Sequence, residues 1–226
     1  MAEERQAKLQ EQVHQLVEEI ENKPDEWAAY ADLVTALTAS GNFVQAEELG
    51  LKSLTLFEAN AEAQAYLAYA VGNNYYAAGH YHEAQNFFQK VDNPKLAHDA
   101  TMMQAQSWYA QKNYKQALAF TLTGIDQQPD DADAQVLLGN IWLALNDFAA
   151  ATRAFEQALA VDPDNFEANF GRGLIATVQH QENPWFEQAK RLDASQFSQK
   201  TQQLDDLVNV MTGGEETHES ATKSDD

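Results

Sequence analysis

Few residues in this chain combine the types and the spacing that catalysis or metal binding requires. His80 and His82 lie two residues apart, as zinc ligands can, but no third ligand is apparent nearby. Gly171 and Gly173 form a lone Gly-x-Gly with no strand before it and no third glycine, so Gly173 is better explained as a small residue at a helix crossing than as part of a phosphate loop. The sequence has no cysteine, and no serine lies in a Gly-x-Ser-x-Gly turn. These observations predict no catalytic residue, no metal site, no cofactor and no enzymatic activity.

The remaining histidines offer no cluster either. Three of them are isolated in the sequence, and we expect them at the surface or in turns: His14, His98 and His180.

Acidic residues dominate the charged residues. The chain of 226 residues has 35 Asp and Glu against 14 Lys and Arg, which gives a net charge of −21. Solubility accounts for part of this excess. A field of this sign repels nucleic acid and anionic lipid, whereas it speeds encounters with a basic protein surface. We therefore expect a protein partner, and no binding to nucleic acid or membrane.

The beginning of the sequence and its hydropathy bear on location. The first residues, from Met1 to Glu4, are largely acidic and lack the apolar stretch of a signal peptide. No apolar run reaches the length of about 18 residues that a membrane span needs. These features predict a cytoplasmic protein.

The helices that would position any site recur with a period of 34 residues. Residues 132–165 are the clearest copy, with small, apolar and proline residues at positions 7, 8, 11, 17, 20, 24, 27 and 32: Leu138, Gly139, Trp142, Phe148, Ala151, Phe155, Ala158 and Pro163. Residues 98–131 repeat this pattern at positions 8, 11, 17, 20 and 32: Ala105, Trp108, Tyr114, Ala117 and Pro129. Aligning the small residue at position 20 places further copies at 27–60, 65–97 and 166–193. A fixed period of this length is typical of stacked helical hairpins.

The positions follow from the packing of a hairpin. Apolar residues at positions 4, 7, 8 and 11 make one face of a first helix. Gly139 and Ala151 are small because the two helices cross there, while Phe148 and Phe155 fill the space behind them. Each hairpin buries its apolar face against its neighbours, so the stack needs no central core. In the last copy, the second helix near Pro184 is expected about three residues early.

Single helices are predicted to close the stack, beginning at the N-terminus. Residues 3–21, within the segment 1–26, form a helix in phase with half a repeat, and its apolar face has five members: Leu9, Val13, Leu16, Val17 and Ile20. A terminal cap needs one such apolar face and one polar face.

The C-terminal end is predicted to have its own capping helix over residues 194–211. Ser195 is the expected N-cap and Gly213-Gly214 the expected stop. Residues 212–226 are polar and acidic, and we expect a disordered tail.

This pattern of small, aromatic and proline positions resembles the tetratricopeptide repeat (TPR), over roughly residues 27–193. It is weaker in 27–60, where Gly50 and Ser53 stand at positions 24 and 27, and in 166–193, where Arg172 stands at position 7. The resemblance implies an all-α fold, a right-handed superhelical solenoid of about five hairpins with a concave groove lined by first helices. It also implies a scaffold or peptide receptor.

Positions 2, 5, 9 and 12 of the first helix face the concave side in TPR hairpins, so the resemblance assigns a ligand-binding groove. Its members here are mostly aromatic, apolar or amide-bearing: Tyr66, Tyr69, Asn73, Tyr76, Met102, Gln106, Tyr109, Val136, Asn140, Leu143, Phe170 and Leu174. Such a composition is typical of an interface centre, and the amides at position 9 could hold the backbone of an extended peptide. The same residues could instead pack between neighbouring helices, or the C-terminal helix or tail could cover the groove.

We therefore expect an adaptor, monomeric when alone, that binds an apolar protein segment with basic flanks. A carboxylate clamp, as in TPR domains that bind chaperone C-termini, is excluded because position 2 is acidic in three repeats: Asp99, Asp133 and Glu167. The alternative is a structural role, in which the groove mediates self-assembly or holds a larger complex together without a peptide ligand. Sedimentation separates the two.

Overall fold

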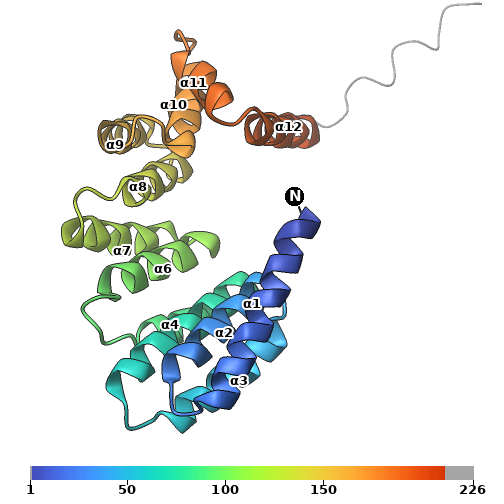
Figure 1. Cartoon of the computed structure of the whole chain (residues 1–226). Helices are drawn as coiled ribbons and strands as arrows, with labels where there is room; N and C mark the ends of the chain where they lie inside the picture. The colour runs from blue at the N-terminus through green and yellow to red at the C-terminus, as the bar shows by residue number, and fades with distance from the viewer. Residues whose placement is uncertain (1, 212–226) are drawn as a thin grey trace, which may run out of the picture.

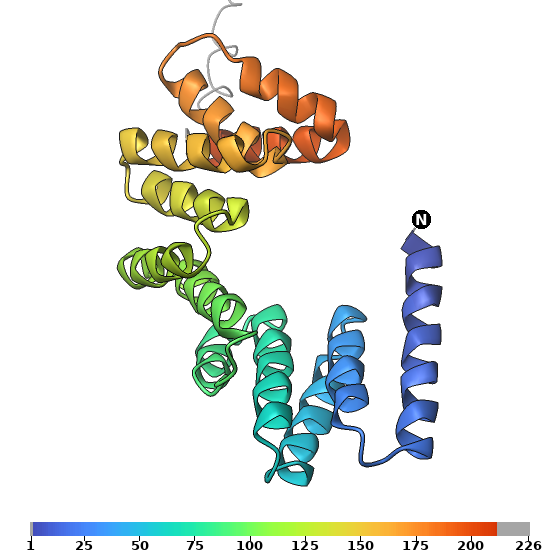
Figure 2. The same ribbon diagram turned by 60° about the vertical axis from the view of Figure 1, so that its left-hand side comes forward.

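The computed structural model describes residues 2–211, and this part of the chain folds into twelve helices. In chain order they are α1 (Ala2–Asn22), α2 (Trp27–Ala39), α3 (Phe43–Leu56), α4 (Ala61–Ala77), α5 (Tyr81–Phe88), α6 (Ala97–Ala110), α7 (Tyr114–Gln127), α8 (Ala132–Ala144), α9 (Phe148–Val161), α10 (Phe166–Val178), α11 (Pro184–Leu192) and α12 (Ala194–Met211). The helices stack into an open arc, in which α6, α8 and α10 lie toward the open side and α7 and α9 lie outside (Figure 1). A second view shows α1 and the last helices at opposite ends of the arc (Figure 2).

Five helix pairs form the hairpins of this arc: α2 with α3, α4 with α5, α6 with α7, α8 with α9, and α10 with α11. The predicted all-α solenoid is confirmed. One helix is longer than the repeat register implies, because α4 begins at Ala61 rather than at position 1 of its repeat, residue 65. Asn60 starts it early, since its side chain accepts a hydrogen bond from the Ala63 backbone N–H at 3.0 Å.

The crossing of α8 and α9 shows why position 8 must be small. A Cβ atom added at Gly139 would lie 2.6 Å from the ring of Phe155, which real side chains do not tolerate. Phe155 and Ala151 are both fully buried. The predicted fit between Gly139, Ala151 and the Phe155 ring is therefore confirmed.

The same glycine–phenylalanine contact recurs in other hairpins. Gly72 lies against Phe88 in the second hairpin, and Gly173 lies against Phe186 in the fifth. Gly173 is thus a packing residue, as its position indicates. Phe186 is at position 21 of its repeat, three positions earlier than Phe155, which is at position 24. Helix α11, however, begins at position 19 with Pro184, two positions later than α9, which begins at position 17. The early register therefore applies to the packing residue and not to the start of the helix.

The turns between the two helices of each hairpin share one backbone conformation. Position 15 of each repeat has a positive φ: Gly41 (76°), Gly79 (82°), Lys112 (59°), Asn146 (65°) and His180 (54°). This left-handed conformation ends the first helix and redirects the chain into the second. It recurs in all five hairpins, including the fifth, whose sequence matches the repeat least well.

Helix α1 packs on the first hairpin through its predicted apolar face. Leu16 is buried against Leu33 and Ala36 of α2, and Val13 and Ile20 pack beside it. Val17, by contrast, is 38% exposed. It lies at the edge of the apolar face.

Helix α12 packs on the last hairpin, but its cap differs from the prediction. Asp193 rather than Ser195 begins it, since the Asp193 carboxylate accepts a hydrogen bond from the Gln196 backbone N–H at 2.8 Å. Ser195 lies inside the first turn of the helix. Phe197 contacts the rings of Phe170 and Phe186. The expected stop at Gly213-Gly214 and the expected tail 212–226 lie outside the described residues.

Replacing Ala151 with leucine is expected to lower the free energy of unfolding by about 1–3 kcal/mol, because the larger side chain must push α8 and α9 apart. Ala151 is fully buried at their crossing. Thermal unfolding followed by circular dichroism measures the change. Ala149→Leu, at an exposed position two residues before it, is the control that should leave stability nearly unchanged. Equal stability of the two variants would show that the position-20 assignment is wrong.

Within residues 2–211, no helix combines the length and the apolar character needed to cross a bilayer.

Candidate functional site

Two tyrosines at position 12 pack within their own hairpins. Tyr76 contacts Tyr81 with ring centroids 5.4 Å apart, and Tyr109 contacts Tyr114 at 5.6 Å. Burial raises the pKa of both Tyr76 and Tyr109, and the neighbouring tyrosine raises it further. Both phenols are half-buried, so each supports the hairpin and still presents part of its surface.

The two tyrosines near the start of α4 have aromatic neighbours as well. Tyr66 lies 5.1 Å from Trp27, and Tyr69 lies 5.9 Å from Phe88, between ring centroids. Burial is the main cause that raises the pKa of Tyr69. A hydrogen bond with Asn73 opposes this rise, and the charge of Asp99 adds to it. The phenol of Tyr69 therefore lies near both a groove amide and a carboxylate of the next repeat.

Three of the predicted groove residues are buried instead. Met102 and Val136 are each 7% exposed and Phe170 is 6% exposed. Met102 turns into the third hairpin, because Gly124 leaves a space there that the Met102 sulfur fills. All three support the concave face from beneath.

Val136 and Phe170 are buried for different reasons. Val136 joins the core cluster that contains Phe155. The ring of Phe170 is covered by Phe186 and by Phe197, with centroids 5.2 and 5.9 Å away. The C-terminal helix thus covers this part of the concave face, which was one of the alternatives left open by the sequence.

Helix α12 also binds the acidic residue at position 2 of the fifth repeat through hydrogen bonds. Glu167 accepts hydrogen bonds from Gln196 and Lys200. Repeats two to four are left as the open part of the face, with Leu174 half-buried at its edge.

The amides at position 9 differ from the buried asparagines of the chain. Asn74 is almost fully buried and donates to the Phe43 carbonyl at 3.0 Å, and buried Asn169 donates to the carbonyls of Pro163 and Asn165. These two amides are used by the fold. Gln106 and Asn140 are half-buried, and no hydrogen bond involves their side chains among the side chains described, those of residue 4 and residues 6–206.

A cavity of about 200 Å³ opens on this face between α4, α6 and the start of α8. It brings together three predicted groove residues, Tyr69, Met102 and Gln106, with five others: His98, Asp99, Met103, Asp131 and Asp133. Two of the carboxylates, Asp99 and Asp133, stand at the acidic position 2 of their repeats, which is the signal for them in the sequence.

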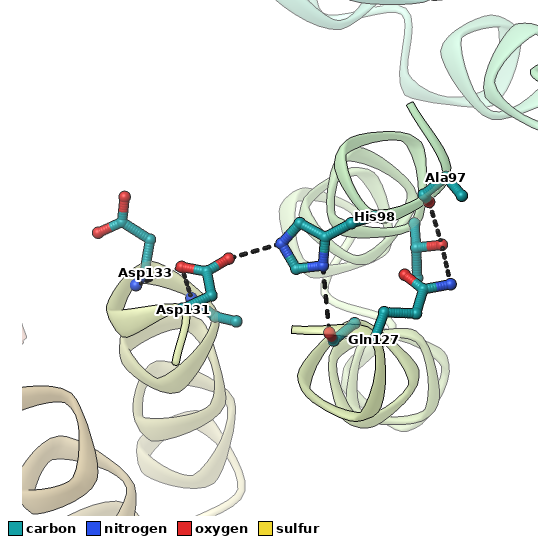
Figure 3. A network of polar contacts seen from close by, with 8 residues as sticks. Ala97, His98, Gln127, Asp131 and Asp133 are labelled. Carbon is teal, nitrogen blue, oxygen red and sulfur yellow. Dashed lines mark hydrogen bonds and ion pairs between the residues drawn. The ribbon is translucent and has the colours of Figure 1, made fainter. Parts of the chain in front are cut away.

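His98 forms the floor of this region and corrects an expectation. It is buried, at 8% exposure, rather than at the surface or in a turn. Its Nδ1 lies 3.1 Å from the Gly124 carbonyl oxygen and its Nε2 lies 2.7 Å from Asp131 Oδ2 (Figure 3). Asp131 in turn caps α8, accepting from the backbone N–H groups of Asp133 and Ala134 at 2.8 and 3.1 Å. His98 therefore joins α6, α7 and α8.

Arg172, whose packing the repeat pattern left uncertain, is buried between two helices. Its guanidinium lies 4.0 Å from the centre of the Trp185 ring and 3.2 Å from Glu156. Its Nε and Nη1 atoms have no hydrogen-bond partner among the described residues. The contacts of its aliphatic stem and guanidinium take the place of the leucine that the first and fourth repeats have at position 7, Leu33 and Leu138.

The concave face of repeats two to four thus presents half-buried aromatic rings, amide side chains and carboxylates. Among the described residues, no cluster of His, Asp and Glu is arranged to hold a metal ion. His80 and His82 are exposed.

Comparisons with known proteins address the fold. A family model described as tetratricopeptide repeat matches residues 69–132 and 137–196. A crystal structure of MamA is 17% identical, covering 71% of this chain and 94% of that chain with a TM-score of 0.58. MamA 41-end from Desulfovibrio magneticus RS-1 is 19% identical, covering 77% and 97% with a TM-score of 0.60.

A third structure is that of YrrB, described as a TPR protein with an unusual peptide-binding site. It is 17% identical and covers 83% of this chain and 97% of that chain with a TM-score of 0.56. No curated protein matches the sequence significantly. At these identities the similar structures show the fold alone. Because the family model matches more than half of the sequence, the chain belongs to the tetratricopeptide repeat family.

Proposed function

We propose that this protein is a non-enzymatic adaptor whose concave face binds an extended protein segment. The observation that carries this proposal is the pair of unused amides, Gln106 and Asn140, at the same position of successive repeats. An amide side chain can donate to and accept from a peptide backbone. Neither amide has a hydrogen-bond partner among the side chains that the structure describes, in contrast to the buried Asn74 and Asn169.

The apolar part of the segment would contact half-buried side chains on either side of these amides. These are Tyr66, Tyr69, Tyr76, Tyr109, Leu143 and Leu174. Tyrosine gives a large contact area at a low entropic cost. The buried Val136 and Phe170 would hold this surface in shape without contacting the ligand.

Two further observations support the proposal. The net charge of −21 favours a segment with basic flanks, since opposite charges speed association. A protein of similar fold, YrrB, is described as having a peptide-binding site. We propose that the protein is cytoplasmic and monomeric when alone; a larger particle in sedimentation would favour the self-assembly role instead.

Replacing Tyr69 and Tyr109 together with alanine is expected to weaken partner binding strongly, because truncation of a central interface aromatic commonly costs about 2 kcal/mol or more. Partners are first captured from native cell lysate with the wild-type chain and identified. Their affinity for the purified variants is then measured by calorimetry, after circular dichroism has shown that helicity is kept.

The matched control is Leu51→Ala/Leu122→Ala, which removes two exposed apolar side chains from the second helices α3 and α7. This control should bind as the wild type does. If the folded tyrosine variant keeps the wild-type affinity for every partner, the concave face is not the binding site.

A further inference from the structure

The cavity between the second, third and fourth repeats is lined by both apolar and acidic side chains. The ring of Tyr69 and the side chains of Met102 and Met103 supply apolar surface. Asp99 and Asp133 supply carboxylates at the opening, where both residues are exposed. Gln106, one of the unused amides, lines the same cavity. The cavity is therefore continuous with the proposed binding groove.

No Lys or Arg is among the described residues that line this cavity. Asp131 is engaged by His98 and by the backbone N–H groups at the start of α8. Asp133 accepts one long hydrogen bond, 3.3 Å, from the Asn165 amide, which brings no charge.

Among the side chains that the structure describes, those of residue 4 and residues 6–206, the ion pairs do not include Asp99. Its charge acts on the Tyr69 hydroxyl, whose pKa it raises. The aromatic wall and the carboxylate of the cavity thus lie within electrostatic reach of one another.

We propose that this cavity receives one lysine or arginine side chain from the middle of the bound segment. The aliphatic stem packs on Tyr69, Met102 and Met103, as long basic side chains do on apolar surfaces. The cationic head lies between Asp99 and Asp133, where solvent access keeps the cost of removing it from water small. This inference rests on the proposed groove function, and it places a cation at the centre of the segment rather than only at its flanks.

The residues that line the cavity favour a basic side chain over an anion, a metal ion or an apolar side chain. An anion would meet three aspartates and is repelled. A metal ion is not favoured, because these residues are not arranged as a ligand set among the described residues. An apolar side chain would fill the inner wall but leave the two exposed carboxylates unpaired.

The test uses the full chain and a library of random 12-residue peptides displayed on phage. Peptides that bind are synthesised, and each Lys or Arg in them is replaced in turn by norleucine or glutamine. Affinities are measured against the wild type, against Asp99→Asn/Asp133→Asn, and against the matched control Asp25→Asn/Asp126→Asn. The control removes two charges from exposed positions that do not line the cavity. A fourth protein, Tyr109→Ala, reports on the groove outside the cavity.

The expected result is that groove-binding peptides share one central Lys or Arg whose replacement by norleucine weakens binding at least tenfold. For Asp99→Asn/Asp133→Asn, the ratio of the dissociation constants of the norleucine peptide and the parent peptide falls to about one. For the control variant this ratio stays at tenfold or more. If peptides lose affinity for Tyr109→Ala but share no cation, or keep the tenfold ratio in the cavity variant, the cavity inference is overturned and the groove function stands. If no selected peptide depends on Tyr109, both are overturned.

Discussion

Replacement of Phe155 with alanine is expected to lower the free energy of unfolding by about 3–5 kcal/mol. The Phe155 side chain is fully buried. Its ring lies between two glycines, Gly139 of its own repeat and Gly171 of the next, each so close that an added Cβ would overlap it. Because neither glycine has a side chain that could move into the space, the cavity left by the truncation stays open, and this places the cost near the top of the range.

The same ring should couple two repeats. Gly139 belongs to α8 and Gly171 to α10, so one side chain contributes to both interfaces of α9. Hydrogen exchange of α8, α9 and α10 is expected to accelerate together in Phe155→Ala. Urea unfolding by circular dichroism measures the total loss, and Leu122→Ala, at an exposed position, is expected to stay within about 0.5 kcal/mol of the wild type. A loss confined to α9, or one as small as that of Leu122→Ala, would contradict the shared packing.

Replacing His98 with leucine is expected to cost about 2–4 kcal/mol, since an orphaned buried hydrogen-bonding group costs about 1–3 kcal/mol. The Gly124 carbonyl and the Asp131 carboxylate lose the ring nitrogens they contact, and at least one of the two acceptors loses a donor, because a neutral imidazole has a single N–H. Asp131 contributes the smaller share, because its side chain is 22% exposed and keeps its bonds to the start of α8.

A double-mutant cycle with Asp131→Asn isolates the contact, because asparagine can still cap α8. We expect the two substitutions together to cost clearly less than the sum of the single losses. The control His82→Leu, on an exposed position of α5, should leave stability nearly unchanged. Additive losses for His98 and Asp131 would show that their contact stabilises nothing.

The core of each hairpin was predictable because it depends on volumes at fixed positions. A glycine at position 8 and a phenylalanine at position 24 can be paired from the sequence, since one must make room for the other. Gly139 with Phe155 follows this rule directly. Met102 does not, because repeat three has Thr121 at position 24 and Gly124 at position 27, and the space left by Gly124 draws in a side chain expected in the groove.

The environment of His98 was missed although a signal existed. Position 1 is apolar in the other four repeats, where it is Trp27, Ala65, Ala132 or Phe166. A histidine at such a position is expected to be at least half-buried and to need hydrogen-bond partners. Those partners, Gly124 and Asp131, lie 26 and 33 residues away along the chain, so a reading of neighbouring residues could not find them.

The left-handed residue at position 15 is a glycine in the first two hairpins and another residue in the last three. Its free-energy cost therefore arises in the unfolded state of the first two hairpins and in the folded state of the others. Gly41 and Gly79 adopt this conformation without steric cost, but glycine has more conformational freedom to lose when the chain orders. Lys112 and His180 lose less freedom, yet their Cβ atoms crowd the backbone once the turn has formed. The N-terminal turns thus bear an entropic cost of ordering, whereas the C-terminal turns keep steric strain that opening releases, so equal stability in the two halves would conceal opposite origins.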